Sequence, residues 1–156
     1  MHVVLFEPEI PPNTGSVARL CAATLTPLHL IEPLGFKIDD KHLKRAGLDY
    51  WEFVDLHVHN SWDSFLLKVA PKNLLFFSKR AAKSYTSVRY RDDDFLVYGP
   101  ETRGLPQTML DAYANDFYRI PMMGAGVRSL NLSNAVSIVL YEGLRQLGKT
   151  EMPPRP

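Results

Sequence analysis

Two polar loops, each directly after a short apolar run, constrain the fold of this chain more than any other feature. Residues 95–98 (FLVY) precede the loop GPETRGLP at 99–106, and residues 117–120 (FYRI) precede the loop that ends in RSLNLSNA at 128–135. Both loops continue into helical patterns. In α/β proteins such loops gather at the carboxyl ends of parallel strands and form the ligand site. The sequence therefore predicts a ligand site built from these two loops.

The second loop is dense in side chains that can hydrogen-bond. They are Arg128, Ser129, Asn131, Ser133 and Asn134. A turn or a single helix cap needs fewer polar groups than this. We therefore expect at least one of these residues to cap the following helix and one or two to face a ligand.

Strand-like runs alternate with helical patterns along most of the chain. The runs are residues 3–6, 28–31, 51–58, 74–77, 95–98 and 117–120. The clearest helical pattern starts at Leu132 and repeats apolar residues at the spacing of one helix face up to Leu147. An earlier one follows two prolines, with Asn13 as its predicted N-cap and Val17 and Cys21 facing inward. The alternation predicts an α/β fold, a mostly parallel sheet with helices on both faces.

The composition is typical of a globular protein. The chain has 156 residues, of which 46% are hydrophobic and 22% charged. No apolar run approaches the length of a membrane span, and the first strand-like run lacks the basic flank of a signal peptide. The single cysteine, Cys21, cannot form an internal disulfide, which favours a reducing compartment. We expect a cytoplasmic protein with one domain over residues 1–148 and a flexible tail over residues 149–156.

The formal net charge of +1 does not by itself indicate a nucleic-acid partner, but the charge is unevenly distributed. Residues 79–91 contain five cations, two interleaved tyrosines and no acid: Lys79, Arg80, Lys83, Arg89 and Arg91, with Tyr85 and Tyr90. Cations with aromatic side chains suit phosphate contact and base stacking. A solvated surface loop is the alternative interpretation of the same residues.

The histidines do not predict a metal site. His57 and His59 could share one face of a strand, but the sequence clusters no third ligand beside them. We therefore expect both to be exposed or half-buried, and we expect no bound metal.

Three segments resemble the motifs of the SPOUT superfamily of S-adenosylmethionine-dependent RNA methyltransferases. They are NTGSVAR at 13–19, YGPETRGL at 98–105, and IPM with RSLNLSNA within 120–135. The segments EPEIPPNTG, RLCA, IEPLGF and DDKHLKRAGLDYWEF are similar to the TrmL/YibK group, the tRNA wobble-nucleotide 2′-O-methyltransferases. The resemblance extends from His2 to about Gly148 and keeps the order and spacing of the family.

This resemblance implies a deep trefoil knot in the C-terminal part, S-adenosylmethionine as the methyl donor, and no metal. It implies a homodimer formed through the helices that follow Asn13 and Asn131. It also implies that the partner is the anticodon stem-loop of tRNA. The methylated ribose would then belong to nucleotide 34, a cytidine or modified uridine, of leucine tRNAs.

The resemblance also assigns roles to residues. Taken alone, Arg19 is a surface arginine, but its place in the first motif implies action on the ribose 2′-hydroxyl. A guanidinium that stabilises a developing alkoxide suits arginine better than a general base, and both alternatives stay open. Glu101 could act in catalysis, cap a loop or pair with Arg103.

The candidate site residues fall into three sets: the family pattern implies the catalytic and cofactor-binding sets, and the basic side chains predict the RNA-binding set. The catalytic set is Arg19, Asn13, Glu101, Asn131 and Ser129. The cofactor-binding set is Phe77, Gly99, Ile120, Ser129 and Leu130. The RNA-binding set is Lys41, Lys44, Arg45, Lys79, Arg80, Arg89 and Arg91.

Three other functions fit parts of the sequence. Gly124 and Gly126 form a weak GxG, but Ser129 stands where a dinucleotide-binding GxGxxG has its last glycine. A non-catalytic RNA-binding module would not need three loop motifs at strand ends. A methyltransferase that acts on another RNA position is the remaining alternative.

Overall fold

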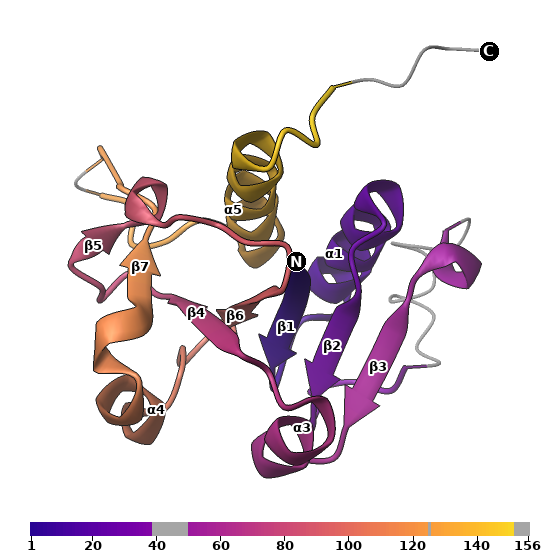
Figure 1. Cartoon of the computed structure of the whole chain (residues 1–156). Coiled ribbons are helices and arrows are strands. Elements are labelled where there is room, and N and C mark those ends of the chain that lie inside the picture. Colours follow the sequence, from indigo (N-terminus) through magenta and orange to yellow (C-terminus); the bar gives the residue numbers. More distant parts are fainter. Residues whose placement is uncertain (39–49, 125, 152–156) are drawn as a thin grey trace.

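A seven-stranded parallel sheet forms the centre of the protein (Figure 1). The computed structural model describes residues 1–38, 50–124 and 126–151. The strands are β1 (His2–Phe6), β2 (Leu28–Ile31), β3 (Leu56–His59), β4 (Asn73–Phe77), β5 (Lys83–Ser84), β6 (Asp94–Tyr98) and β7 (Phe117–Arg119). Their order across the sheet is β3-β2-β1-β6-β4-β7-β5, and all these neighbours pair in parallel. The predicted α/β class is confirmed.

Helices cover both faces of the sheet, as the alternating pattern predicts. They are α1 (Pro11–Thr24), α3 (Trp62–Val69), α4 (Gln107–Ala112) and α5 (Leu132–Gln146), with short 3₁₀ turns η1 (Trp51–Phe53), η2 (Tyr85–Ser87) and η3 (Ala114–Asp116). α1 and α5 lie together over one face, whereas α3 and α4 lie over the other (Figure 1). Among the described residues, no helix is both long and apolar enough to cross a membrane.

The central strands are apolar on both sides because both sides are covered. On the α1 and α5 side, Val3 and Leu96 of the sheet pack in the same core as Val139 of α5. On the other side, Val4 belongs to a second core that contains Phe65 of α3. Alternate residues of each strand therefore support two cores, and the strands that carry the polar loops are held from both faces.

α1 begins earlier than predicted. Pro11 and Pro12 occupy its first turn, where backbone N–H groups have no helical partner, and Ile10 is the N-cap. The prediction that Asn13 is the N-cap is therefore wrong, because this residue is the third of the helix and is buried. Cys21 faces the core as predicted, and burial raises the pKa of its thiol to about 12.

The predicted strand at residues 51–58 is only partly correct. Its first part forms η1, in which the Phe53 N–H donates to the Tyr50 carbonyl at 3.0 Å, and β3 starts only at Leu56. Trp51 and Val54 pack against the core from this turn, so tertiary packing overrides the local strand pattern. β5 has two residues, which is too short for a periodic signal.

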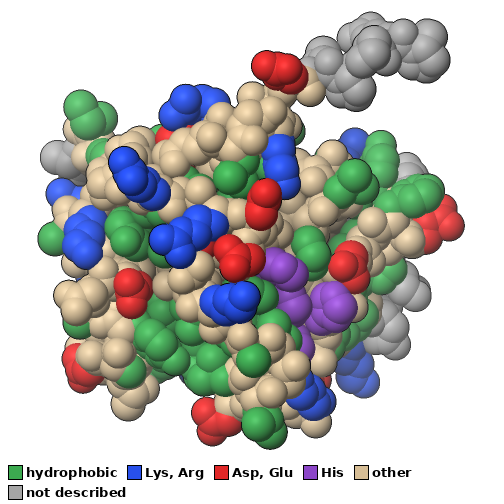
Figure 2. All heavy atoms as spheres, in the orientation of Figure 1, with side chains coloured by type: hydrophobic (Ala, Val, Ile, Leu, Met, Phe, Trp, Pro, Cys, Tyr) green, Lys and Arg blue, Asp and Glu red, His purple; other side chains and the backbone are tan. Residues whose placement is uncertain are grey.

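Four histidines lie together on strands β1, β2 and β3, on the side of the sheet that α3 partly covers (Figure 2). His2 Nδ1 lies 3.1 Å from His29 Nε2, and His29 Nδ1 lies 3.0 Å from His59 Nε2. The His57 ring stacks on the His29 ring with centroids 4.8 Å apart. A neutral imidazole has one N–H, so His29 donates one of its two hydrogen bonds and accepts the other.

This chain of hydrogen bonds suits neutral rings. Burial, followed by the neighbouring histidines, lowers the pKa of His29 to about 3. Burial also lowers the pKa values of His2 and His59. The prediction that His59 is exposed or half-buried is wrong, because His29 and Phe65 cover this ring.

Acid should destabilise the fold through His29. Below about pH 6.5 the unfolded chain binds a proton at this ring, whereas the folded chain binds it only near pH 3, so the free energy of unfolding falls with falling pH. One such ring costs about 1.4 kcal/mol per pH unit within this window. His29→Gln should therefore flatten the pH dependence of the unfolding free energy, measured by urea denaturation between about pH 6 and pH 4.

His57→Gln is the matched control for this measurement. The His57 side chain lies on the same face of the sheet as His29, but it is 46% exposed. The His57→Gln variant should therefore keep the wild-type dependence of the unfolding free energy on pH. A slope that is the same in the wild type and in His29→Gln would contradict the assignment of acid sensitivity to the buried ring.

Candidate functional site

A cavity of about 500 Å³ lies at the carboxyl ends of β4, β6 and β7. Residues 77–80 after β4, residues 98–105 after β6 and residues from the loop before α5 line it. Ile10 and Asn13, at the start of α1, close one side. The parallel sheet places the carboxyl ends of these strands along one edge, which brings the two predicted loops to the same cavity.

All five residues that the family resemblance implies for cofactor binding line this cavity: Phe77, Gly99, Ile120, Ser129 and Leu130. Phe77 is the last residue of β4, and Gly99 and Ile120 directly follow β6 and β7. The chain therefore leaves the sheet at the cavity wall. The other two stand just before α5. The structure brings the set together, and binding of a cofactor by these residues stays a prediction.

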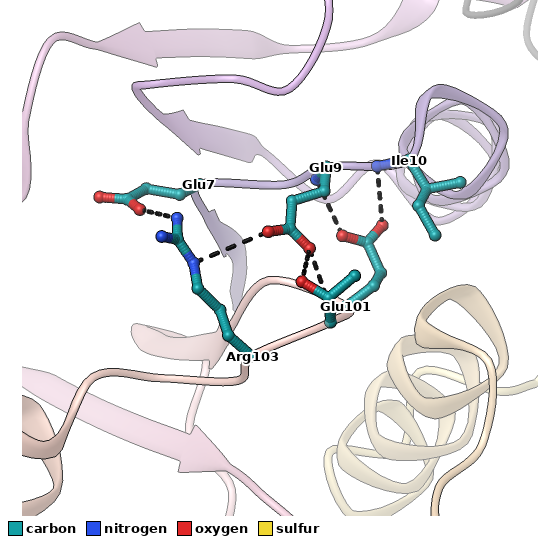
Figure 3. A network of polar contacts seen from close by, with 6 residues as sticks. Glu7, Glu9, Ile10, Glu101 and Arg103 are labelled. Carbon is teal, nitrogen blue, oxygen red and sulfur yellow. Dashed lines mark hydrogen bonds and ion pairs between the residues drawn. The ribbon is translucent and has the colours of Figure 1, made fainter.

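Glu101 connects the loop at residues 99–106 to the start of α1. Its carboxylate accepts hydrogen bonds from the backbone N–H groups of Glu9 at 2.8 Å and Ile10 at 3.3 Å (Figure 3). It also accepts a hydrogen bond from Asn13 Nδ2 at 3.1 Å. The two prolines that follow Ile10 have no N–H, and a carboxylate is favourable at a helix N-terminus. Of the roles predicted for Glu101, the structure shows that its carboxylate caps the loop directly before α1.

Asn13 extends this connection to the loop before α5. Asn131 Nδ2 donates to Asn13 Oδ1 at 2.8 Å. Asn131 Oδ1 accepts hydrogen bonds from the Ser133 backbone N–H at 2.9 Å and the Ser133 hydroxyl at 2.7 Å, and Asn131 is the N-cap of α5. Both amide side chains therefore have a defined orientation. Glu101, Asn13 and Asn131 form one hydrogen-bonded chain through the three motifs.

Two glycines shape the loop at residues 99–106. A Cβ at Gly99 would lie 2.5 Å from the Leu105 backbone nitrogen and 2.8 Å from the Gly104 carbonyl carbon. Gly104 itself has a φ of +71°, a conformation that favours glycine. At Gly99 the chain therefore approaches its own turn closely, and the loop folds back along the cavity wall.

Arg19 lies apart from the cavity. It is exposed on α1, with its guanidinium carbon 4.6 Å from the centroid of the Tyr50 ring and its Nη2 3.4 Å from the Tyr50 hydroxyl. It is not among the described residues that line the cavity. Arg19 follows Asn13 by six residues, which corresponds to about 9 Å along a helix. A group that contacts both Arg19 and the cavity would have to lie between them.

The basic segment at residues 79–91 is anchored to the fold. β5 and η2 lie within it, and Val88 and Tyr90 are buried. The Tyr90 hydroxyl donates to the Tyr85 carbonyl at 2.9 Å, so the prediction that Tyr90 stacks on a base is wrong. The cations are exposed: Lys79, Arg80, Lys83, Arg89 and Arg91.

Two of these cations have an additional position. Lys79 and Arg80 also line the cavity, so positive charge stands beside the predicted cofactor site. The other residues predicted to bind RNA lie outside the described residues: Lys41, Lys44 and Arg45.

The lining suits an organic ligand with apolar and polar parts. Apolar side chains come from Ile10, Leu105, Leu130, Leu132 and Ala135, and polar ones from Asn13, Ser129 and Asn131. Ligand pockets usually combine an apolar surface with a few polar groups that set orientation, in volumes of roughly 300–1,000 Å³. Within residues 1–38, 50–124 and 126–151, no group of three His, Cys, Asp or Glu side chains could hold a metal ion.

No pattern in the sequence predicts the contacts between Glu9 and Thr102. The Thr102 backbone N–H and hydroxyl donate to the Glu9 carboxylate at 2.9 Å and 2.6 Å. The two residues are 93 positions apart, so no local pattern connects them. Both residues follow strand-like runs, which is the one pattern that could have indicated this contact. The sequence does not predict, however, that these two strands are neighbours.

Comparisons with known proteins agree with the motifs at this site. A sequence model of the SpoU rRNA Methylase family matches residues 1–141. The chain is 52% identical over 148 residues to the tRNA (cytidine(34)-2′-O)-methyltransferase of Saccharophagus degradans, an alignment that covers 94% of this chain and 96% of that protein.

Solved structures share the fold. One, which concerns the 2-OH methylation of C/U34 on tRNA, matches with a TM-score of 0.87 and 49% identity over 94% of this chain and 95% of that chain. The SpoU methyltransferase AviRb from Streptomyces viridochromogenes, in complex with the cofactor AdoMet, matches with a TM-score of 0.84. Its identity is 22% over 94% of this chain and 60% of that chain, so this second likeness concerns the fold alone.

Proposed function

Because this chain belongs to the SpoU rRNA Methylase family, we propose that it transfers a methyl group from S-adenosylmethionine to the ribose 2′-hydroxyl of nucleotide 34 in tRNA. The nucleotide is a cytidine or a modified uridine, and leucine tRNAs are the expected substrates. A relative whose name states this activity on cytidine 34 is 52% identical over nearly the whole of both chains, which supports the proposal.

The observation that carries the proposal is the meeting of three sequence motifs at one cavity. Glu101, Asn13 and Asn131 come from different motifs and share one chain of hydrogen bonds. Their amide and carboxylate groups hold one another in place, so each needs little rearrangement when a ligand binds. Preorganised polar groups of this kind favour a reaction that requires little more than alignment.

S-Adenosylmethionine would supply an activated methyl group on its sulfonium when bound. In this chain, Phe77, Gly99 and Ile120 would provide backbone groups at the strand ends, and Leu130 would provide an apolar surface. Ser129 stands beside them with a hydroxyl that can orient a polar part of the ligand. These residues bind, orient and exclude water, and the proposal requires no metal.

Arg19 would act on the 2′-hydroxyl from outside the cavity. A guanidinium keeps its proton under ordinary conditions, so it is better suited to donating a hydrogen bond to a developing alkoxide than to removing a proton. The exposed position on α1, one to two turns beyond Asn13, leaves room for a nucleotide between Arg19 and the cavity. Stacking on Tyr50 would hold the guanidinium ready for this contact.

We also propose the deep trefoil knot that the family resemblance implies. β4 lies between β6 and β7, although it precedes both in the sequence. After β4 the chain forms β5 at the edge of the sheet, returns to β6 on the other side of β4, and then crosses back to β7. These crossings on both sides of one strand are compatible with threading of the C-terminal segment through a loop.

The protein is expected to act in the cytoplasm as a homodimer formed through α1 and α5. These helices lie side by side, and α5 exposes Ile138 and Tyr141 away from the core. Arg145 also faces outward, where its guanidinium pairs with Glu142 through two contacts of 2.9 Å. Sedimentation equilibrium at micromolar concentration should give twice the chain mass of 17.7 kDa. A monomer in this measurement would contradict the dimer.

Mass spectrometry of tRNA nucleosides tests the reaction itself. After incubation with the protein and S-adenosylmethionine, unmodified tRNA should gain a 2′-O-methyl group at nucleotide 34. Arg19→Ala should fold and bind the cofactor as the wild type does. Its turnover should fall by about 100- to 1,000-fold, the usual effect of losing a preorganised donor to developing negative charge. Methylation at another position would favour the alternative RNA substrate.

Arg19→Lys separates the two possible roles of this side chain. Lysine keeps the positive charge but loses the planar geometry of the guanidinium, so a role in orientation predicts poor rescue. Activity above the wild type at alkaline pH would instead favour proton removal at this position. Near-normal turnover of Arg19→Ala would show that the first-motif role is not carried by this residue.

Lys79 and Arg80 are expected to contact tRNA phosphates at the mouth of the cavity. Replacing both by Ala should weaken tRNA binding and reduce the slope of log affinity against log salt by roughly one for each lost contact. The paired change Lys68→Ala and Lys72→Ala is the control, since these exposed lysines lie at the end of α3 and before β4, away from the cavity. An unaltered salt slope in the Lys79 and Arg80 variant would reject them as phosphate ligands.

A further inference from the structure

We infer that Glu9 and Thr102 are positioning residues that hold two walls of the cavity at the spacing required for cofactor binding. The inference rests on the proposed function of this cavity. We call the set of polar contacts between residues 7–10 and residues 101–103 the latch. Its two sides belong to the loop between β1 and α1 and to the loop after β6.

The latch consists of bonds in both directions between the two segments (Figure 3). Thr102 donates its backbone N–H at 2.9 Å and its hydroxyl at 2.6 Å to one oxygen of the Glu9 carboxylate. The Glu9 N–H in turn donates to the Glu101 carboxylate at 2.8 Å. Arg103 forms an ion pair with Glu7, and its Nε lies 3.7 Å from Glu9 Oε1.

The hydrogen bonds that Glu9 accepts stabilise the latch more than the ion pairs of Arg103 do. The Arg103 side chain is 60% exposed, and ion pairs at such positions contribute little. The Glu9 carboxylate instead receives two donors from one residue, in a geometry that fixes the position of Thr102. These bonds, followed by the charge of Arg103, lower the pKa of the Glu9 carboxyl, so it stays ionised at neutral pH.

The sheet cannot set this spacing by itself. β1 and β6 are neighbours, but their pairing ends at Leu5 and Tyr98, before either segment of the latch. Glu7, just after β1, has a φ of +47°, which is unfavourable for a residue with a Cβ. Such a conformation persists only where surrounding contacts maintain it. The latch supplies those contacts.

Gly35 limits the movement of Glu9 from the other side. A Cβ at Gly35 would lie 2.8 Å from the Glu9 Cα and from its carbonyl oxygen. The Gly35 N–H also donates to the Pro8 carbonyl at 2.9 Å. Glu9 is therefore confined between Gly35 and Thr102, directly before Ile10 and Asn13, which line the cavity. A loosened latch would displace this wall without unfolding either core.

Calorimetry with S-adenosylmethionine tests the latch. Glu9→Ala should weaken cofactor binding by about 3- to 30-fold, the range expected for a residue that acts on a site through packed neighbours. Thr102→Val, which removes only the hydroxyl bond, should have a smaller effect. The double variant should bind as Glu9→Ala does, because both changes remove the same bond. Glu9→Gln should restore most of the affinity, since its amide oxygen can still accept both bonds from Thr102.

Asp111→Asn is the matched control. This carboxylate is exposed on α4 and accepts a hydrogen bond from Gln107 at 2.8 Å, so the variant should bind the cofactor as the wild type does. Thermal unfolding without cofactor checks that the variants fold. Hydrogen exchange without cofactor should show faster exchange of the Thr102 amide in Glu9→Ala than in the wild type.

The outcomes separate the latch from the proposed function. If the wild type binds S-adenosylmethionine and a folded Glu9→Ala binds it equally well, the latch is overturned and the proposed function stands. Additive effects of the two single variants would also overturn the latch. If Glu9→Ala does not fold, Thr102→Val provides the test. Wild-type affinity for S-adenosylmethionine together with wild-type rates of amide hydrogen exchange in Thr102→Val would overturn the inference. Absence of binding by the wild type would overturn the proposed cofactor site together with the latch.

Discussion

The site depends on the hydrogen bonds that the Glu101 carboxylate accepts. This carboxylate accepts hydrogen bonds from two backbone N–H groups before α1 and from the Asn13 amide, so it orients both the helix start and a side chain at the cavity. Asn13 then has only one way to face Asn131, which caps α5. The carboxylate connects its own loop to the start of α1, where negative charge is favourable, and Asn13 extends the connection to the segment before α5.

The parallel sheet makes this arrangement possible. Because all its strands run in one direction, the loops that follow β1, β4, β6 and β7 leave the sheet at the same edge. The two cores hold the strands from both faces, and they also anchor parts of the loops, since Leu105 belongs to one core and Ile120 packs against the other. Polar contacts between the loops and core side chains such as Phe77, Tyr98 and Leu105 together define the shape of the cavity. The buried histidine chain lies on β1, β2 and β3, where none of its residues lines the cavity, and it serves the fold rather than this site.

The parts of the structure that could be predicted are those with a local physical cause. The apolar stripe from Leu132 predicts α5, and the runs before the two polar loops predict β6 and β7. Predictions failed where packing or a distant partner decided. Asn13 has the residue type of an N-cap, but the prolines before it start the helix and Glu101 satisfies the preceding N–H groups. Residues 51–53 alternate like a strand, yet they turn because Trp51 packs into the core.

The sequence by itself determined the fold class, the two polar loops and the residue types available for chemistry, because periodicity and turn-forming residues act over a few positions. Only the tertiary structure decided that Asn13, Glu101 and Asn131 share one hydrogen-bonded chain, that Glu9 meets Thr102, and that Arg19 stands outside the cavity. These contacts join residues 88 to 118 positions apart. They depend on which strands become neighbours, and strand order is a property of the packed sheet that no local pattern encodes.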